Sequence, residues 1–249
     1  VQDVVTSIEI ENAKVKGLRT ERDNFFSCKA IILTTGTFLK GLIHIGSFNQ
    51  SAGRIGDFSA EHLSQSLLDM GLELGRLKTG TPQRVNGKTL DFSKCESQEP
   101  DDEPFFFSYS SDISNWKELK QLPCYITYTG EKTHEIIKAN IHRSHLYGGV
   151  IKGVGPRYCP SIEDKVVRFS DKPRHQLFLE PEGLMTNEYY INGFSSSLPE
   201  DVQLEMVRTI PGLENVQVMK PAYAVEYDFV PPHQVYPTLE TKKVSGLYN

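Results

Sequence analysis

The segment from Gly153 to Lys165 carries the densest group of reactive side chains in the sequence. It reads Gly-Val-Gly-Pro-Arg-Tyr-Cys-Pro-Ser-Ile-Glu-Asp-Lys, and its glycines and prolines favour a non-repetitive loop. An arginine, a thiol, a hydroxyl, two carboxylates and a lysine follow one another closely. Arg157 and Lys165 flank Cys159, and nearby positive charge favours the nucleophilic thiolate. The pattern indicates either an activated thiol or a small buried cysteine in a salt-bridged loop.

The same segment partly matches the GxGxxG loop that binds dinucleotide phosphates. Gly153 and Gly155 supply the first glycines, but the third glycine is missing. The pattern by itself therefore gives weak support for a phosphate site.

Strand patterns precede this segment. Apolar runs over 4–10 and 13–18, followed by a turn at Asp23-Asn24, predict a meander. The meander is expected to lead into a fully buried strand over Lys29–Thr35. This strand stops at Gly36, where a glycine lets the backbone turn sharply or approach a ligand closely.

Helical patterns alternate with these strands and indicate an α/β architecture. Ser59 is predicted to cap a helix, and further helices are expected from Thr133 and from Pro199. The sequence becomes more polar after Pro82, where we place a domain boundary. The residues after this boundary read as mixed α+β, and Asn86-Gly87 predicts a hairpin turn.

Composition describes an ordinary folded chain. Its 249 residues are 38% hydrophobic and 24% charged, and no apolar run approaches the roughly 18–20 residues that cross a bilayer. The four cysteines form no CxxC pair, so we expect neither a zinc site nor a disulfide framework. Reduced thiols fit a cytosol-like compartment. No targeting signal is visible in the opening residues.

Local basic stretches and scattered histidines need separate consideration. The net charge of -5 gives no global attraction to nucleic acid, but a local basic face is sufficient for binding. Each basic stretch is also compatible with an ordinary solvated surface. The histidines lack the spacing of a metal site, so no metal is predicted. The basic residues are Arg76, Lys78, Arg84 and Lys88, then Lys152, Arg157, Lys165, Arg168, Lys172 and Arg174, and the histidines are His134, His142 and His145.

Ordered motifs along nearly the whole chain resemble the GidA/MnmG family. They recur in the same order and are numerous enough to leave little room for chance. The motifs are Thr35–Leu39, His44–Gly46, Gly53-Arg54, Arg76–Pro82, Cys124–Thr127, Gly155–Lys165, Phe178–Gly183, Ser197–Pro199, Pro221–Ala224, Glu226–Asp228 and Thr238–Glu240.

The resemblance implies part of a glutathione-reductase-like FAD-binding domain with an inserted α+β domain. Residues 1–81 and 234–249 would belong to the FAD-binding domain. Residues 82–233 would form the insertion that handles NAD(H) and substrate. The implied enzyme works with the GTPase MnmE to build an aminomethyl or carboxymethylaminomethyl group on C5 of a tRNA wobble uridine. Its implied cofactors are FAD, NADH and methylenetetrahydrofolate as the one-carbon donor.

The resemblance also implies site residues. Cys159 would be catalytic, either adding to the pyrimidine ring or moving a proton. Val1, Gly36 and Thr37 would lie on the FAD side. The nicotinamide-site loop would comprise Gly155, Pro156, Arg157, Tyr158, Cys159, Pro160, Ser161, Ile162, Glu163, Asp164, Lys165, Val166, Val167, Arg168 and Phe169.

Several family features have no counterpart in these residues, including the amino-terminal GxGxxG loop and the helical tail that contacts MnmE. We therefore expect an internal fragment with little activity by itself. The full-length protein would be a homodimer in the cytoplasm, or in the mitochondrion of a eukaryote. The alternatives are a related folate- and FAD-dependent tRNA uridine methyltransferase and a noncatalytic module that binds tRNA or a partner.

Overall fold

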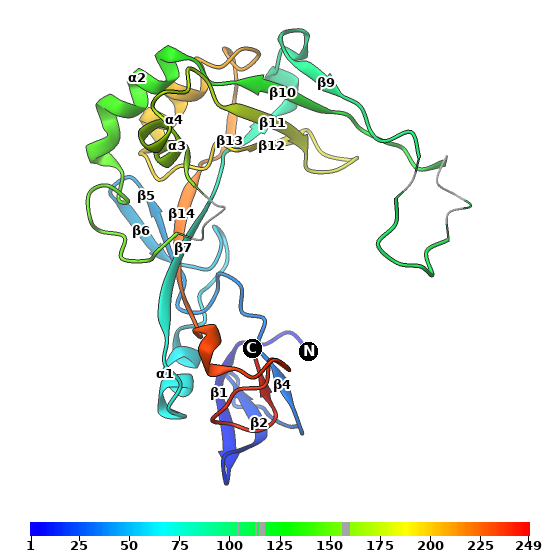
Figure 1. The fold of residues 1–249 in the computed structure, drawn as a ribbon, viewed down its shortest axis with the longest axis vertical. Coiled ribbons are helices and arrows are strands. Elements are labelled where there is room, and N and C mark those ends of the chain that lie inside the picture. Colours follow the sequence, from blue (N-terminus) through cyan, green and yellow to red (C-terminus); the bar gives the residue numbers. More distant parts are fainter. Residues whose placement is uncertain (104, 113, 115–117, 156–159) are drawn as a thin grey trace. The chain divides into compact units, whose positions relative to one another are not determined.

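The computed structural model describes residues 1–103, 105–112, 114, 118–155 and 160–249. The described residues form two compact units (Figure 1). Unit 1 contains Val1–Thr79, the described part of 148–159, and Ala224–Asn249. Unit 2 contains Gly80–Tyr147 and Pro160–Tyr223.

An antiparallel meander opens unit 1, as the sequence predicted. Its strands are β1 (Val5–Glu11), β2 (Lys14–Thr20) and β3 (Phe25–Ser27). Helix α1 (Glu61–Asp69) packs against β1, and Leu63 and Leu67 of the helix are buried in the same apolar cluster as Ile8. The meander and the helix thus share one core.

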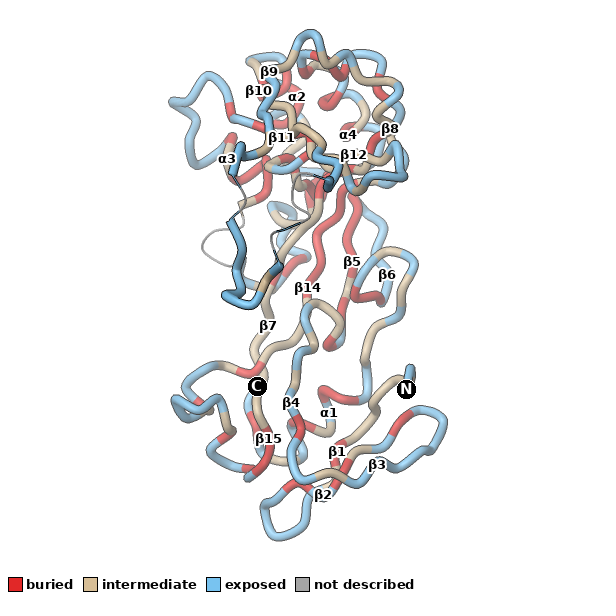
Figure 2. Tube along the Cα trace, turned by 90° about the vertical axis from the view of Figure 1, so that its right-hand side faces the viewer, coloured by how far each residue is buried: buried red, intermediate tan, exposed pale blue. Residues whose placement is uncertain are grey.

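A second sheet of unit 1 has the strand order β6-β5-β14-β7. These strands are β5 (Leu42–Ile45), β6 (Phe48–Ser51), β7 (Gly75–Thr81) and β14 (Tyr223–Phe229). Strand β14 pairs antiparallel with β5, and Figure 2 shows buried stretches along both. The centre of this sheet is therefore a water-excluded environment for any polar side chain that it carries.

The strand predicted over Lys29–Thr35 differs from the observed one. Strand β4 spans only Ile31–Ile32 and pairs in parallel with β15 (Leu247–Tyr248). Ile31 is buried against the core, whereas Ile32 is 73% exposed, because successive side chains of a strand point to opposite faces. The prediction of a fully buried strand was wrong.

The start of α1 also corrects a prediction. The N-cap is Ala60, which provides no side-chain hydrogen bond, and Ser59 Oγ instead donates to the Phe38 carbonyl at 3.4 Å. The cap was misplaced because the serine hydroxyl donates to a backbone carbonyl here and does not accept from an N–H of the first helical turn. The helix gives way to Gly71, whose φ of +82° suits glycine, as the sequence predicted.

Unit 2 is built on an antiparallel sheet with the strand order β13-β8-β12-β11-β10-β9. The Asn86-Gly87 hairpin was predicted wrongly, because the chain continues into a 3-10 turn, η1 (Gly87–Thr89), and β8 pairs with strands distant in sequence. The strands are β8 (Arg84–Asn86), β9 (Glu96–Gln98), β10 (Cys124–Tyr128), β11 (Gln176–Pro181), β12 (Glu188–Asn192) and β13 (Val218–Lys220).

Helices α2 (Glu131–Asn140), α3 (Ile162–Arg168) and α4 (Glu200–Val207) complete unit 2. The predicted helices near Thr133 and after Pro199 are confirmed. Apolar residues of the helices pack with those of β11 and β12 in one core, which includes Ile137, Ile162, Val166, Leu177, Leu179, Ile191, Met206 and Val207. Short 3-10 turns η2 (Phe92–Lys94), η4 (Ile141–Arg143) and η5 (Pro232–Gln234) lie elsewhere in the chain.

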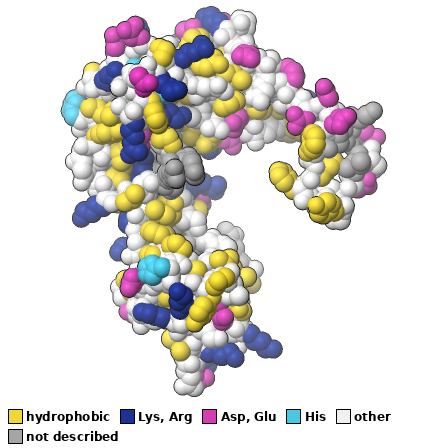
Figure 3. Space-filling model, viewed as in Figure 1, with side chains coloured by type: hydrophobic (Ala, Val, Ile, Leu, Met, Phe, Trp, Pro, Cys, Tyr) yellow, Lys and Arg dark blue, Asp and Glu magenta, His cyan; other side chains and the backbone are white. Residues whose placement is uncertain are grey.

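The segment between β9 and β10 exposes aromatic side chains. Phe105, Phe107 and Tyr109 are each more than 80% exposed, and Figure 3 shows hydrophobic and acidic side chains together on this segment. The predicted domain boundaries fall after residues 81 and 233, whereas unit 1 ends first at Thr79, includes the described part of 148–159 and resumes at Ala224. The roles of the units as FAD-binding and inserted domains stay a prediction.

Candidate functional site

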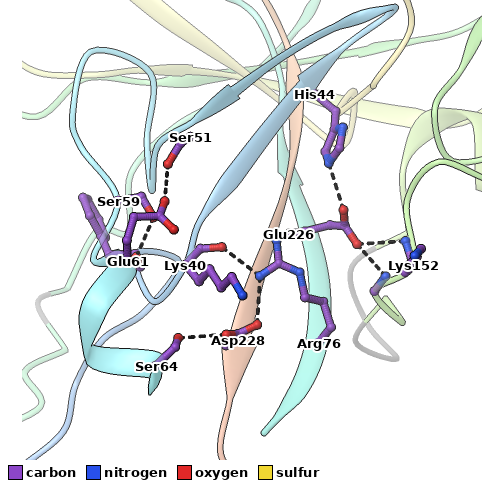
Figure 4. Close-up of polar contacts among 12 residues, drawn as sticks. Lys40, His44, Ser51, Ser59, Glu61, Ser64, Arg76, Lys152, Glu226 and Asp228 are labelled. Atoms are coloured by element: carbon purple, nitrogen blue, oxygen red, sulfur yellow. Dashed lines mark hydrogen bonds and ion pairs between the residues drawn. The ribbon is translucent and has the colours of Figure 1, made fainter. Parts of the chain in front are cut away.

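The chain segment that leads into the predicted nicotinamide loop is held by the carboxylate of Glu226. Glu226 Oε1 accepts hydrogen bonds from the backbone N–H groups of Lys152 at 2.8 Å and Gly153 at 2.7 Å. Figure 4 shows both bonds reaching one oxygen from the approaching segment. Hydrogen bonds to a charged acceptor are about twice as strong as neutral ones. Strand β14 therefore fixes the position of residues 152–153 within unit 1.

His44 of β5 occupies the other oxygen of this carboxylate. His44 Nε2 lies 2.9 Å from Glu226 Oε2, and both residues are buried, at 1% and 4% exposure. His44 pairs with Ala224 across the sheet, and Leu42 with Glu226, so the histidine and the glutamate are diagonal neighbours. A carboxylate only accepts, so Nε2 donates. Both oxygens are satisfied, as a buried carboxylate requires.

Strand β7 also holds the segment of residues 152–154, through backbone hydrogen bonds. The backbone N–H of Lys78 donates to the Val154 carbonyl at 3.1 Å, and the N–H of Val154 donates to the Arg76 carbonyl at 3.3 Å. A Cβ on Gly153 would lie 2.7 Å from the Leu77 carbonyl oxygen, a distance that real Cβ atoms do not tolerate. Glycine is thus required at position 153 for backbone contact with β7.

A second network in unit 1 lies farther along β14. Arg76 Nη1 donates to Asp228 Oδ1 at 2.9 Å and to the Lys40 carbonyl at 2.8 Å, and Ser64 Oγ donates to Asp228 Oδ2 at 2.8 Å (Figure 4). This network joins β7, β14 and α1. Its side-chain bonds stabilise the scaffold of unit 1.

Helix α3 follows the predicted catalytic cysteine in sequence and lies in unit 2. Ser161 is its N-cap: Ser161 Oγ accepts from the backbone N–H of Asp164 at 3.2 Å, and Asp164 Oδ2 accepts from the N–H of Ser161 at 3.2 Å. This reciprocal pair is a capping box. Pro156, Arg157, Tyr158 and Cys159 lie outside the described residues.

Glu163 and Lys165 fasten α3 to the turn before α4. Glu163 is fully buried, and its Oε1 accepts from the Ser197 backbone N–H at 2.9 Å and from Ser196 Oγ at 3.1 Å. Lys165 Nζ donates to the Gly193 carbonyl at 2.9 Å. These predicted cofactor residues have a structural task within unit 2.

The remaining residues of α3 divide between core and surface. Ile162 and Val166 are buried in the unit 2 core, whereas Val167, Arg168 and Phe169 are exposed. Gly155 and Pro160 lie on either side of the undescribed positions. The cofactor role of the whole segment stays a prediction.

The predicted FAD-side residues belong to unit 1. Val1 is fully exposed, and Gly36 has a φ of +53° with open space where a Cβ would stand. Thr37 Oγ1 donates to the Gly53 carbonyl at 2.7 Å and so fixes the turn after Gly36. A groove of about 360 Å³ beside this turn is lined mainly by apolar residues, including Ile31, Leu33 and Phe38. An open glycine backbone beside a groove fits one side of a bound nucleotide cofactor.

Cys95 and Cys124 show no sign of an activated thiolate. Burial raises the pKa of Cys95 and of Cys124, and Glu180 raises that of Cys124 further. Cys28, Cys95 and Cys124 are free thiols.

No group of three or more His, Cys, Asp or Glu that could hold a metal occurs among the described residues. In the same part of the chain, no helix is long and apolar enough to cross a bilayer.

Sequence reasoning assigned no role to His44 or Glu226. Both lie inside motifs that carried the family resemblance, and each is a polar residue whose two neighbours in the sequence are apolar or aromatic. That combination was the available signal. The bond to residues 152–153 was not foreseeable, because it joins positions 73 and 74 residues apart in sequence.

These features define a mixed α/β protein in which the buried carboxylate of Glu226 anchors the backbone of residues 152–153. Residues 1–249 match the model of the family described as Glucose inhibited division protein A, so the chain belongs to that family. This finding confirms the family predicted from the motifs.

Curated relatives share this region at high identity. The chain is 60% identical over 247 residues to a protein of Thermodesulfovibrio yellowstonii and 55% identical over 247 residues to one of a Nitratiruptor species. Both relatives are named tRNA uridine 5-carboxymethylaminomethyl modification enzyme MnmG. The matches cover 99% of this chain but 39% of each relative's length.

A solved structure shares the fold. The structure of Aquifex aeolicus GidA in its form I crystal superimposes with a TM-score of 0.90 at 52% identity, covering 99% of this chain and 42% of that chain. The form II crystal gives a TM-score of 0.89 at 48% identity. The predicted fold class is confirmed.

Proposed function

We propose that this chain supplies the central part of a flavin-dependent enzyme that builds the carboxymethylaminomethyl group on C5 of a tRNA wobble uridine. The single observation that carries the proposal is the 60% identity to a relative named for that modification across 99% of the chain. Because the chain spans about 39% of such relatives, activity and tight FAD binding are expected to require the remaining parts of a full-length protein.

The proposed division of labour follows the units. Val1, Gly36 and Thr37 of unit 1 would contact FAD, and the open backbone at Gly36 supports this assignment. Gly155–Phe169 would contact reduced nicotinamide. When bound, FAD supplies the redox chemistry, NADH renews its reduced form, and methylenetetrahydrofolate supplies the carbon. The protein's own contribution is to bind and orient these groups and to exclude water from them.

Cys159 is proposed as the catalytic residue. As a thiolate, this residue would add to the pyrimidine ring, and as a thiol it would donate a proton during the ring's substitution. The neighbouring Arg157 and Lys165 supply positive charge in the sequence, which favours the thiolate. Replacing Cys159 with Ser in the full-length protein is expected to abolish modification while leaving bound FAD unchanged.

The proposed partners are tRNA and the GTPase MnmE, in a homodimeric protein of the cytoplasm. Exposed Arg168, Lys172 and Arg174 follow one another at the end of α3 and beyond it, and they offer positive charge to a phosphate backbone. Arg174 also stacks over Tyr128, with its guanidinium carbon 4.0 Å from the ring centroid.

Nucleoside analysis of tRNA from a deletion strain tests the proposal. Loss of the aminomethyl-type wobble nucleoside, restored by the wild-type gene, is the expected result. Loss of ribothymidine instead would indicate a tRNA methyltransferase. An unchanged nucleoside profile would indicate a noncatalytic binding module, and either of these outcomes would overturn the proposal.

A further inference from the structure

We propose that Glu226 is a positioning residue for the nicotinamide-site loop and that His44 fixes its carboxylate in place. The inference rests on the proposed function, because the loop's task is defined there. Its structural basis is independent of that function. One buried carboxylate joins strand β5, through His44, to the backbone of residues 152–153, which run into Gly155.

The geometry favours positioning over simple strand stabilisation. Strands β5 and β14 already pair through their own backbone groups, so the sheet does not need a side-chain bond to hold its register. The two N–H groups of Lys152 and Gly153 converge on one oxygen at 2.8 and 2.7 Å, which fixes both the place and the direction of the segment.

His44 restricts the carboxylate to the one rotamer that reaches the segment. Its Nε2 bond to Oε2 leaves Oε1 turned toward residues 152–153, as Figure 4 shows. Both side chains are shielded from water, so water cannot readily replace either partner. Loss of the His44 donor would therefore leave the Glu226 carboxylate less firmly held against residues 152–153.

The contacts of Gly153 with β7 limit the segment further. Val154 pairs with Leu77 of β7, and Lys152 and Gly153 donate to Glu226 of β14, the strand next to β7 in the same sheet. A segment bonded to two strands keeps the backbone of residues 152–154 in one orientation, which saves ordering cost when a ligand binds beside it. Releasing the Glu226 bond should weaken ligand binding more than it changes the chemical step.

The test compares four variants in a full-length protein that carries this sequence. Glu226→Ala removes the anchor, and Glu226→Gln keeps an oxygen that can accept both N–H bonds. His44→Gln keeps a donor near the position of Nε2. Asp228→Asn is the matched control, because Asp228 lies two residues along β14 and bonds Ser64 and Arg76 instead.

The first measurement is amide hydrogen exchange of the peptide that contains residues 152–154. Glu226→Ala should speed exchange there about tenfold, since hydrogen bonds to a charged group carry that order of stabilisation. Glu226→Gln and His44→Gln should recover most of the protection. Asp228→Asn should lower the melting temperature without changing exchange at these amides. Equal exchange in Glu226→Ala and the wild type would overturn the anchor.

The second measurement is anaerobic flavin reduction by NADH. Glu226→Ala should raise the half-saturating NADH concentration about tenfold with bound FAD unchanged, and the limiting rate should fall less. If Glu226→Ala raised the half-saturating NADH concentration no more than Asp228→Asn does, relative to the change in limiting rate, the positioning role would be overturned. If NADH did not reduce the flavin of the wild type, the assignment of this loop to nicotinamide binding would fail. Amide hydrogen exchange would still show whether Glu226 anchors residues 152–153.

Discussion

The carboxylate of Glu163 lies 2.9 Å from the backbone nitrogen of Ser197, so helix α3 is bonded directly to the turn that precedes α4. The glutamate is fully buried and also accepts from Ser196 Oγ. A residue predicted for cofactor contact is therefore also part of the frame of unit 2. Stability measurements can test the structural role of Glu163 separately from the predicted cofactor contact.

Glu163→Ala should lower the free energy of unfolding by about 3 kcal/mol, because the buried donors of Ser196 and Ser197 lose their shared acceptor. Glu163→Gln should cost less, since its amide oxygen can accept the Ser197 N–H. Denaturant unfolding followed by circular dichroism measures both. Val167→Ala on the exposed side of α3 is the control and should stay within about 0.5 kcal/mol of the wild type. A loss in Glu163→Ala no larger than in this control would contradict the structural role.

Gly153→Ala should disrupt the docking of the 152–154 segment on β7. The added Cβ would meet the Leu77 carbonyl oxygen at 2.7 Å, and the backbone must shift at a cost of about 1–3 kcal/mol. Gly155→Ala is a matched stability control, since the nearest atom to its Cβ is the Lys78 carbonyl oxygen at 3.9 Å. Thermal unfolding measures the difference. Equal melting temperatures for the two variants would show that the close approach is absent.

The paired histidines of unit 2 should make its stability depend on pH. The ring centroids of His134 and His175 lie 5.2 Å apart, and both residues are buried. Burial lowers the pKa of His134, with a further contribution from Lys138. Burial also lowers the pKa of His175, followed by the charges of His134, Lys165 and Lys172.

The sign follows from the lowered pKa values. Between the unfolded pKa of about 6.5 and the lower folded values, the unfolded chain binds protons that the folded chain does not. The histidine contribution to stability is therefore present above pH 6.5 and is lost as the pH falls through the folded pKa values. Melting temperatures measured from about pH 7.5 to about pH 5 should fall more steeply in the wild type than in a His134→Gln/His175→Gln double variant. Parallel slopes would exclude the pair as the cause.

The sequence predicted the fold where local signals agreed with tertiary packing. The meander of β1 to β3 and the helices after Thr133 and Pro199 follow apolar periodicity that the cores then use. The prediction of a Ser59 cap failed because the hydroxyl donates to the Phe38 carbonyl, 21 residues away in sequence. The prediction of an Asn86-Gly87 hairpin failed because β8 pairs with strands distant in sequence. Local patterns carry no information on such partners.

Only part of the candidate site could be predicted from the sequence. The Gly153–Lys165 segment stands out by its reactive residue types, but its anchor does not. Glu226 and Lys152 are 74 residues apart, and no spacing rule joins them. Likewise, Glu163 and Lys165 read as candidate ligand contacts, although their side chains form hydrogen bonds with the turn over 193–197.

Alkylation of the cysteines should separate Cys159 from the other thiols. Burial raises the pKa values of Cys95 and Cys124, which lowers their thiolate fractions at neutral pH and slows their reaction with iodoacetamide. If Cys159 is activated as proposed, peptide mass spectrometry of a full-length protein at neutral pH should find it alkylated well before these two. Raising the pH toward 9 should speed the reaction of Cys95 and Cys124 more than that of Cys159, because their thiolates are still scarce at neutral pH. Faster alkylation of Cys95 or Cys124 at neutral pH would count against an activated thiol at Cys159.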